Sequence, residues 1–248
     1  QEAHVGIGIK GEEGLQAVNA SDYAIAQFRF LTVLLLKHGR YNYVRMAALV
    51  CYMFYKNIFM SLGQFWFNFN NAWSGQKYYN ELAIQAFNLV YTSFPIILLA
   101  AYDKDITTTS CYIFPQDYQD GIKNKHFSAK RFWIWLLTAI IESVIVSVLP
   151  LYFMYNSGEH GGDYSFWAGG TMTYTCVVIV CNIKLLFLQT RWHWFNIILI
   201  ILSMLMWLAT SIWWSLWPSF SILYTYTGVA TSILSDGAYW AGWILICT

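Results

Sequence analysis

The chain has 248 residues, of which 58% are hydrophobic and only 11% are charged, whereas a soluble domain carries about 25% charged residues. One soluble core of this length cannot hide so much apolar surface, so the composition indicates a lipid bilayer as the solvent. The formal net charge of +1 lacks the basic excess that nucleic-acid binding needs, so we expect no nucleic-acid partner.

Residues 1–40 differ from the rest of the chain and begin with a strand–helix–strand pattern. Residues 4–9 are typical of a short strand, residues 12–20 of a short helix and residues 23–26 of a second strand. Two strands and one helix cannot form a core alone, so we expect the end of an α/β domain. Residues 6–11 match GxGxxG, but a dinucleotide site would need a complete βαβ unit with an acidic residue about 20 positions on, and the next apolar stretch already leads into a predicted span.

Long apolar runs follow, each with the roughly 20 residues that a helix needs to cross the hydrocarbon core. Unpaired backbone groups in lipid are costly, so these runs are expected to be helical. We predict a polytopic α-helical membrane domain over residues 41–248, with six spans of which the last is truncated by the end of the chain. The predicted spans cover about residues 46–67, 82–101, 132–154, 170–189, 194–214 and 237–248.

Lysine and arginine gather on one side of the predicted spans, as the positive-inside rule requires of cytosolic segments. They lie before the first span, in the 102–131 loop and near Arg191, whereas the opposite loops hold only Lys77. We therefore expect the N-terminal segment and the 102–131 loop in the cytosol, and the other loops on the lumenal or exterior side. These other loops are residues 68–81, 155–168 and 215–236. Tryptophans stand at many span ends, as an interfacial belt does: Trp66, Trp133, Trp167, Trp192, Trp194, Trp217 and Trp240.

Lys56 is the most informative residue of the predicted spans. It lies about 16 Å along a helix from Arg45, near mid-membrane, where a charge is costly and usually functional. Asn57 is adjacent and Asn88 is expected at a similar depth in the second span, so the three side chains are expected to form a polar strip that holds a hydrated group. Pro95 frees a backbone carbonyl in that span and permits a kink. The alternative is a lysine that snorkels or pairs structurally with a neighbouring helix.

Glu142 in the third span and Lys184 in the fourth, with Asn182 close by, are the other intramembrane polar candidates. Their long side chains can meet although their expected depths differ. We interpret this pair as structural first, because each charge would stabilise the other. The five cysteines (Cys51, Cys111, Cys176, Cys181 and Cys247) lack CxxC spacing, so we expect buried thiols, with neither a disulfide nor a metal site.

Several segments together resemble one family. The leader HVGIGIKGEEGLQAVNASDYAIAQFRFL is followed by LLLKHGRYNYVRMAALVCYMFYKNI, QFWFNFNNAWSGQ and AFNLVYTSFPIIL, and later by FPQDYQDG and GGTMTYTCVVIVCNIK. The most specific pieces are Tyr55-Lys56-Asn57 and Ser74-Gly75-Gln76. The whole resembles the C-terminal membrane half of a type IV P-type ATPase, a phospholipid flippase, with the end of its HAD-like phosphorylation domain over residues 1–40.

The resemblance implies an ATP-driven flippase that moves phospholipid from the exoplasmic to the cytosolic leaflet through a phosphoenzyme. It places Lys56, Asn57 and Asn88 on the lipid path, and Glu142 where the family is expected to have a neutral or His-like residue. It implies Mg²⁺ and ATP bound outside these residues, and a two-span glycosylated accessory subunit as partner. The implied location is the plasma membrane or a secretory or endosomal membrane. A fixed ammonium at Lys56 would repel a metal cation and attract a phosphate or carboxylate headgroup.

The DKTG motif with the phosphorylated Asp and the Mg²⁺-binding GDGxND motif are not in these residues. The chain begins at Gln1 and not at Met, so we expect a piece of a longer protein. Two alternatives are a P-type cation pump, which the lack of acidic residues in the first two spans disfavours, and a flippase-like regulatory half fused to a guanylyl cyclase. An unrelated channel or scaffold is a weaker alternative, which the glycine-rich leader disfavours.

Overall fold

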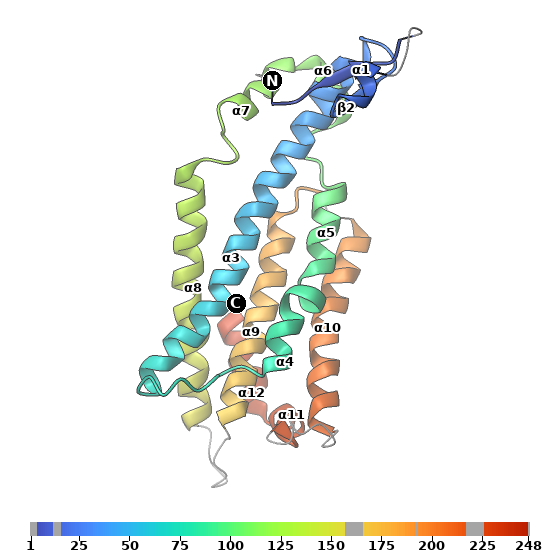
Figure 1. Cartoon of the computed structure of the whole chain (residues 1–248). Helices are drawn as coiled ribbons and strands as arrows, with labels where there is room; N and C mark the ends of the chain where they lie inside the picture. The colour runs from blue at the N-terminus through green and yellow to red at the C-terminus, as the bar shows by residue number, and fades with distance from the viewer. Residues whose placement is uncertain (1–3, 12–15, 157–165, 192, 217–225, 248) are drawn as a thin grey trace. The chain divides into compact units, whose positions relative to one another are not determined.

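In its described residues, the computed structural model of the chain forms helices, their connecting loops and one small two-stranded sheet (Figure 1). It describes residues 4–11, 16–156, 166–191, 193–216 and 226–247. Parts of the predicted helix 12–20 and of the predicted loops 155–168 and 215–236 lie outside the described residues, as do Trp192 and Trp217.

The chain divides into two compact units. The leader unit contains Gln1–Ala47 and Lys104–Phe127, and the bundle unit contains Ala48–Asp103 and Ser128–Thr248. The predicted domain boundary at residue 40 assigns the whole 102–131 loop to the membrane domain. In the structure most of that loop belongs to the leader unit.

The leader unit starts with strands β1 (Ile7–Ile9) and β2 (Tyr23–Ile25), which pair in parallel with Ile7 opposite Tyr23. Parallel strands need a crossover connection, and helix α1 (Gln16–Asn19) lies within it. The predicted strand–helix–strand order is therefore confirmed for the described residues. The unit continues through α2 (Phe30–Thr32), the π-helix η1 (Val33–Gly39) and the start of α3, and later through α6 (Thr108–Ile113), η3 (Pro115–Tyr118) and α7 (Gln119–Ile122).

The bundle unit is built from long helices and several shorter segments. They are α3 (Arg40–Asn70, which begins in the leader unit), α4 (Glu81–Ala86), the π-helix η2 (Phe87–Tyr91), α5 (Ser93–Tyr102), α8 (Ala129–Asn156), α9 (Phe166–Leu188), α10 (Trp194–Leu216), α11 (Val229–Leu234) and α12 (Gly237–Cys247). Helix α9 is central, since it packs against α8, α10 and α12 and most of its residues are buried.

Five helical segments among the described residues are long and apolar enough to cross a membrane. They are Phe30–Asn70, Glu81–Tyr102, Ala129–Leu151, Phe166–Leu188 and Trp194–Leu216, and each contains or overlaps one of the first five predicted spans. A multi-pass helical membrane protein is therefore confirmed. The sixth span stays a prediction, because α12 has 11 residues and a crossing helix needs about 20.

The second membrane segment breaks in the middle, as Pro95 led us to expect. Helix α4 is followed directly by the π-helix η2, and α5 starts at Ser93. Between η2 and α5, Thr92 has non-helical backbone angles of φ −131° and ψ −8°. Proline has no N–H and clashes with the carbonyl four residues earlier, which here is that of Tyr91. This freed carbonyl accepts hydrogen bonds from Asn182 Nδ2 at 3.3 Å and from the Ser203 hydroxyl. Side chains of the neighbouring helices α9 and α10 thus supply the hydrogen bonds that the Tyr91 carbonyl lacks at the kink.

Candidate functional site

The Lys56 ammonium lies inside the bundle unit, where the residue is only 1% exposed. Its Nζ donates a hydrogen bond of 2.8 Å to Thr92 Oγ1 and lies 5.9 Å from the centroid of the Phe87 ring. Among the described residues no ion pair includes Lys56. A buried charge is normally paired, so the contacts of this ammonium leave its charge uncompensated.

Thr92 holds this ammonium because the second membrane segment breaks beside it. In the break, Thr92 Oγ1 donates to the Phe87 carbonyl at 2.8 Å, so its lone pairs are available to accept from Lys56. Sequence reasoning missed Thr92. The available signal was a hydroxyl residue three positions before Pro95 in an apolar span, where a freed backbone group needs a partner.

Asn57 and Asn88 do not lie beside the Lys56 ammonium, so the prediction that the three side chains form one polar strip is wrong. Both side chains are exposed in the isolated chain, whereas Lys56 is buried. Consecutive residues of an α-helix point about 100° apart, so burial of Lys56 turns Asn57 to another face of α3. Asn88 lies directly after the buried Phe87 and is turned outward for a similar reason. A role for either amide in lipid transport stays a prediction.

Glu142 and Lys184 do meet, and Tyr55 joins them. Lys184 Nζ lies 2.6 Å from Glu142 Oε1, and the Tyr55 hydroxyl donates to Glu142 Oε2. The ammonium of Lys184 also lies 5.1 Å from the centroid of the Tyr55 ring. These contacts tie α3, α8 and α9 together through a charge-balanced network, which we call the Glu142 triad. Its two charged side chains are 29% and 27% exposed.

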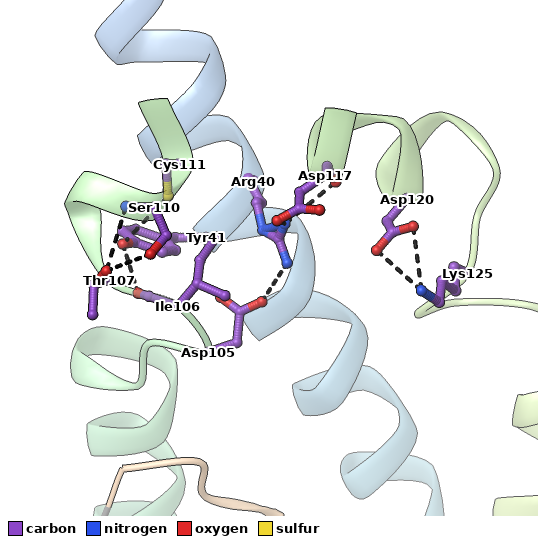
Figure 2. Close-up of polar contacts among 10 residues, drawn as sticks. All are labelled: Arg40, Tyr41, Asp105, Ile106, Thr107, Ser110, Cys111, Asp117, Asp120 and Lys125. Carbon is purple, nitrogen blue, oxygen red and sulfur yellow. Dashed lines mark hydrogen bonds and ion pairs between the residues drawn. The ribbon is translucent and has the colours of Figure 1, made fainter. Parts of the chain in front are cut away.

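A second polar cluster lies in the leader unit, at the start of α3 (Figure 2). Arg40 Nη2 lies 2.6 Å from Asp105 Oδ2, and Arg40 Nη1 donates to the Asp117 carbonyl at 3.3 Å. The Tyr41 hydroxyl donates to the Ile106 carbonyl at 2.9 Å. Asp117 belongs to the FPQDYQDG motif, so these contacts give the motif a structural role. They hold the start of α3 against Lys104–Phe127.

The described residues contain no group of three His, Cys, Asp or Glu side chains that could hold a metal ion. The polar contacts described above for the bundle are made by ammonium, carboxylate, amide and hydroxyl groups. Membrane-length helices around an uncompensated ammonium define a polytopic membrane protein with an intramembrane polar site.

Comparison with known sequences identifies the family. Residues 18–248 match the sequence profile of the phospholipid-translocating P-type ATPase C-terminal family, so the chain belongs to that family. The resemblance seen in the sequence is thereby confirmed.

Curated relatives carry consistent names. The chain is 38% identical to "Probable phospholipid-transporting ATPase 5" of Arabidopsis thaliana over 89% of its length, and 39% identical to "Probable phospholipid-transporting ATPase IM" of Homo sapiens over 90%. It is 37% identical over 97% of its length to "Phospholipid-transporting ATPase DNF1" of Saccharomyces cerevisiae. The matches cover 18%, 18% and 15% of these relatives. The chain thus spans less than a fifth of their length.

Proposed function

We propose that the full-length protein is an ATP-driven flippase that moves phospholipid from the exoplasmic to the cytosolic leaflet through a phosphoenzyme cycle. The family match supports this proposal, as do relatives named phospholipid-transporting ATPases. The same names disfavour a cation pump and a cyclase-fused regulatory half. In this proposal ATP and Mg²⁺ bind to parts of the protein outside these residues.

The observation that carries the proposal is the uncompensated charge of Lys56. Its ammonium contacts a hydroxyl and the face of an aromatic ring, and these neutral groups offset only part of the cost of burying a charge. A phosphate or carboxylate group would supply the missing charge through a charge-assisted hydrogen bond. Phospholipid headgroups carry such anions, whereas a metal cation would be repelled.

The remaining elements take supporting roles in the proposal. Residues 1–40 form the end of a HAD-like phosphorylation domain on the cytosolic side, and residues 41–248 form six spans with the truncated one last. Asn57 and Asn88 line the lipid path from faces that are exposed in this chain. The partners are the phospholipid substrate and a two-span glycosylated accessory subunit, in the plasma membrane or a secretory or endosomal membrane.

The test is ATP-dependent movement of fluorescent phospholipids by the full-length protein in liposomes. Lys56→Met should still form phosphoenzyme but should lose most lipid movement and most lipid-stimulated dephosphorylation, because the headgroup loses its cationic partner. Lys77→Met is the matched control, since Lys77 is exposed and paired with Glu81 at 2.7 Å. Unchanged lipid movement in Lys56→Met would refute the assigned role of Lys56, and a full-length protein without ATP-dependent lipid movement would refute the function.

A further inference from the structure

The connection between α3 and α4 sends two tyrosines into the bundle. Residues 72–77 are exposed, but Tyr78 and Tyr79 are only 1% and 2% exposed. Burial raises the pKa of both phenols above its ordinary value, so both hydroxyls stay protonated and can donate hydrogen bonds. Loops normally run over the protein surface. This loop is unusual because its exposed residues 72–77 lead directly into two adjacent buried tyrosines.

Tyr78 is fixed by contacts of its ring, its backbone N–H and its hydroxyl. Its ring stacks on Phe67 with centroids 4.2 Å apart, its N–H donates to Gln64 Oε1 at 2.7 Å, and its hydroxyl lies 3.1 Å from Thr173 Oγ1. The Tyr78 carbonyl occupies the space that a side chain at Gly170 would need. Gly170 therefore permits the loop backbone to pack directly against α9.

Tyr79 is buried just as deeply but is not held by hydrogen bonds. Its hydroxyl lies over Gly63 of α3, in the space that a methyl group there would fill, and Ser147 Oγ lies 3.4 Å from the same point. Within the described part of the chain, neither hydroxyl has a hydrogen-bond partner. Buried polar groups without partners destabilise the arrangement that buries them. Tyr79 is therefore held by its ring, which lies 5.5 Å from the rings of Tyr78 and Tyr174 between centroids, and not by its hydroxyl.

Gly63 lies on the same face of α3 as Lys56. Seven residues separate two positions by about two turns, or roughly 10 Å along the helix, and return them to one side. Phe59 and Met60 lie between them and are also buried. Tyr79 therefore covers the buried face of α3 about two turns from Lys56, towards the end of α3 at Asn70.

We propose that Tyr78 and Tyr79 form a gate between the exoplasmic side and Lys56, in which Tyr78 is the fixed anchor and Tyr79 is the part that withdraws. This gate rests on the proposed flippase function and on the side assigned to the 68–81 loop. A phospholipid headgroup passes when Tyr79 leaves Gly63. The hydroxyls of Tyr79 and Ser147 then gain hydrogen-bond partners in water or in headgroup oxygens.

The gate is tested by the accessibility of a cysteine placed behind it. Met60→Cys is introduced into the full-length protein after its native cysteines are replaced, and a membrane-impermeant maleimide is added to each side separately. Tyr79→Ala should accelerate exoplasmic labelling several-fold relative to the unmodified gate. Gly63→Ala should do the same with Tyr79 retained, because its methyl group displaces the tyrosine. Tyr79→Phe should label no faster than the unmodified gate, because it removes an unpaired hydroxyl and keeps the ring.

Trp73→Ala is the matched control, since it truncates an exposed aromatic residue of the same loop. Phosphoenzyme formation shows that each variant is folded. Equal exoplasmic labelling in Tyr79→Ala and the unmodified gate would overturn the proposal, as would acceleration only from the cytosolic side. Labelling does not depend on lipid movement, so a gated protein that moves no lipid would refute the flippase function and leave the gate intact.

Discussion

Lys56 and Lys184 are both lysines of the bundle unit, but their surroundings differ in charge. Lys184 faces the Glu142 carboxylate at 2.6 Å, whereas Lys56 faces the Thr92 hydroxyl at 2.8 Å and an aromatic ring. The two sites use consecutive residues of α3, since Tyr55 donates a hydrogen bond to Glu142 and Lys56 is the next residue. Among the described residues, the Glu142 triad balances its two charges, whereas Lys56 makes no ion pair.

This difference separates a structural role from a ligand-binding role. A paired charge matters for stability because loss of one partner leaves the other buried and uncompensated. The Lys56 charge has no such partner among the described residues, so in the proposed function its partner is an anion that arrives from outside. Lys184 is therefore expected to matter for stability and Lys56 for lipid.

The largest effect on stability is expected from Glu142→Leu. This change leaves the Lys184 ammonium and the Tyr55 hydroxyl without their common partner, and should destabilise the protein by about 2–4 kcal/mol, since partial exposure softens the loss. Thermal unfolding of the full-length protein in detergent measures it. The double variant Glu142→Leu with Lys184→Leu should recover much of the loss. A double variant as unstable as the sum of both single changes would show that the pair is not coupled.

A smaller effect is expected from Thr92→Val, which keeps the shape of the side chain and removes its hydroxyl. Lys56 then loses its hydrogen-bond acceptor and the Phe87 carbonyl loses its donor, at a total cost of about 1–3 kcal/mol in the lipid-free state. In the proposed function a bound anion replaces the acceptor of Lys56, so apparent lipid affinity should be kept or raised while stability without lipid falls. The check is thermal unfolding with and without phospholipid. An equal loss under both conditions would contradict the role of Thr92 as a stand-in for the ligand.

The smallest stability effect is expected from Asn57→Ala and Asn88→Ala. Both amides are exposed in this chain, so each change should alter the stability by less than about 0.5 kcal/mol. On the proposed lipid path, each should still slow lipid movement, by less than Lys56→Met does. A variant with unchanged transport would remove that residue from the path.

Much of the fold could be predicted from residue patterns, because membrane spans and kinks depend on local sequence. The apolar runs, the strand–helix–strand leader and the break before Pro95 all follow from composition and backbone chemistry. The pairing of Glu142 with Lys184 could be anticipated because two opposite charges in apolar surroundings have few alternatives.

The contacts of Lys56 could not be predicted in the same way. They depend on the rotation of α3, which tertiary packing fixes, and this rotation turned Asn57 away and brought Thr92 in. Tyr78 and Tyr79 were missed for a related reason. Their insertion depends on Gly63 and Gly170, distant glycines whose lack of a side chain has meaning only once the helices are packed.

The most direct test of the account compares Lys56→Met and Lys184→Met in the full-length protein. The quantity is the phospholipid concentration that half-maximally stimulates dephosphorylation. Lys56→Met should raise it about tenfold or more, a loss of about 1.4 kcal/mol of binding free energy, whereas Lys184→Met should lower thermal stability and leave this concentration unchanged. Equal shifts in the two variants, or no shift in Lys56→Met, would contradict the claim that Lys56 is the cation that meets the lipid headgroup.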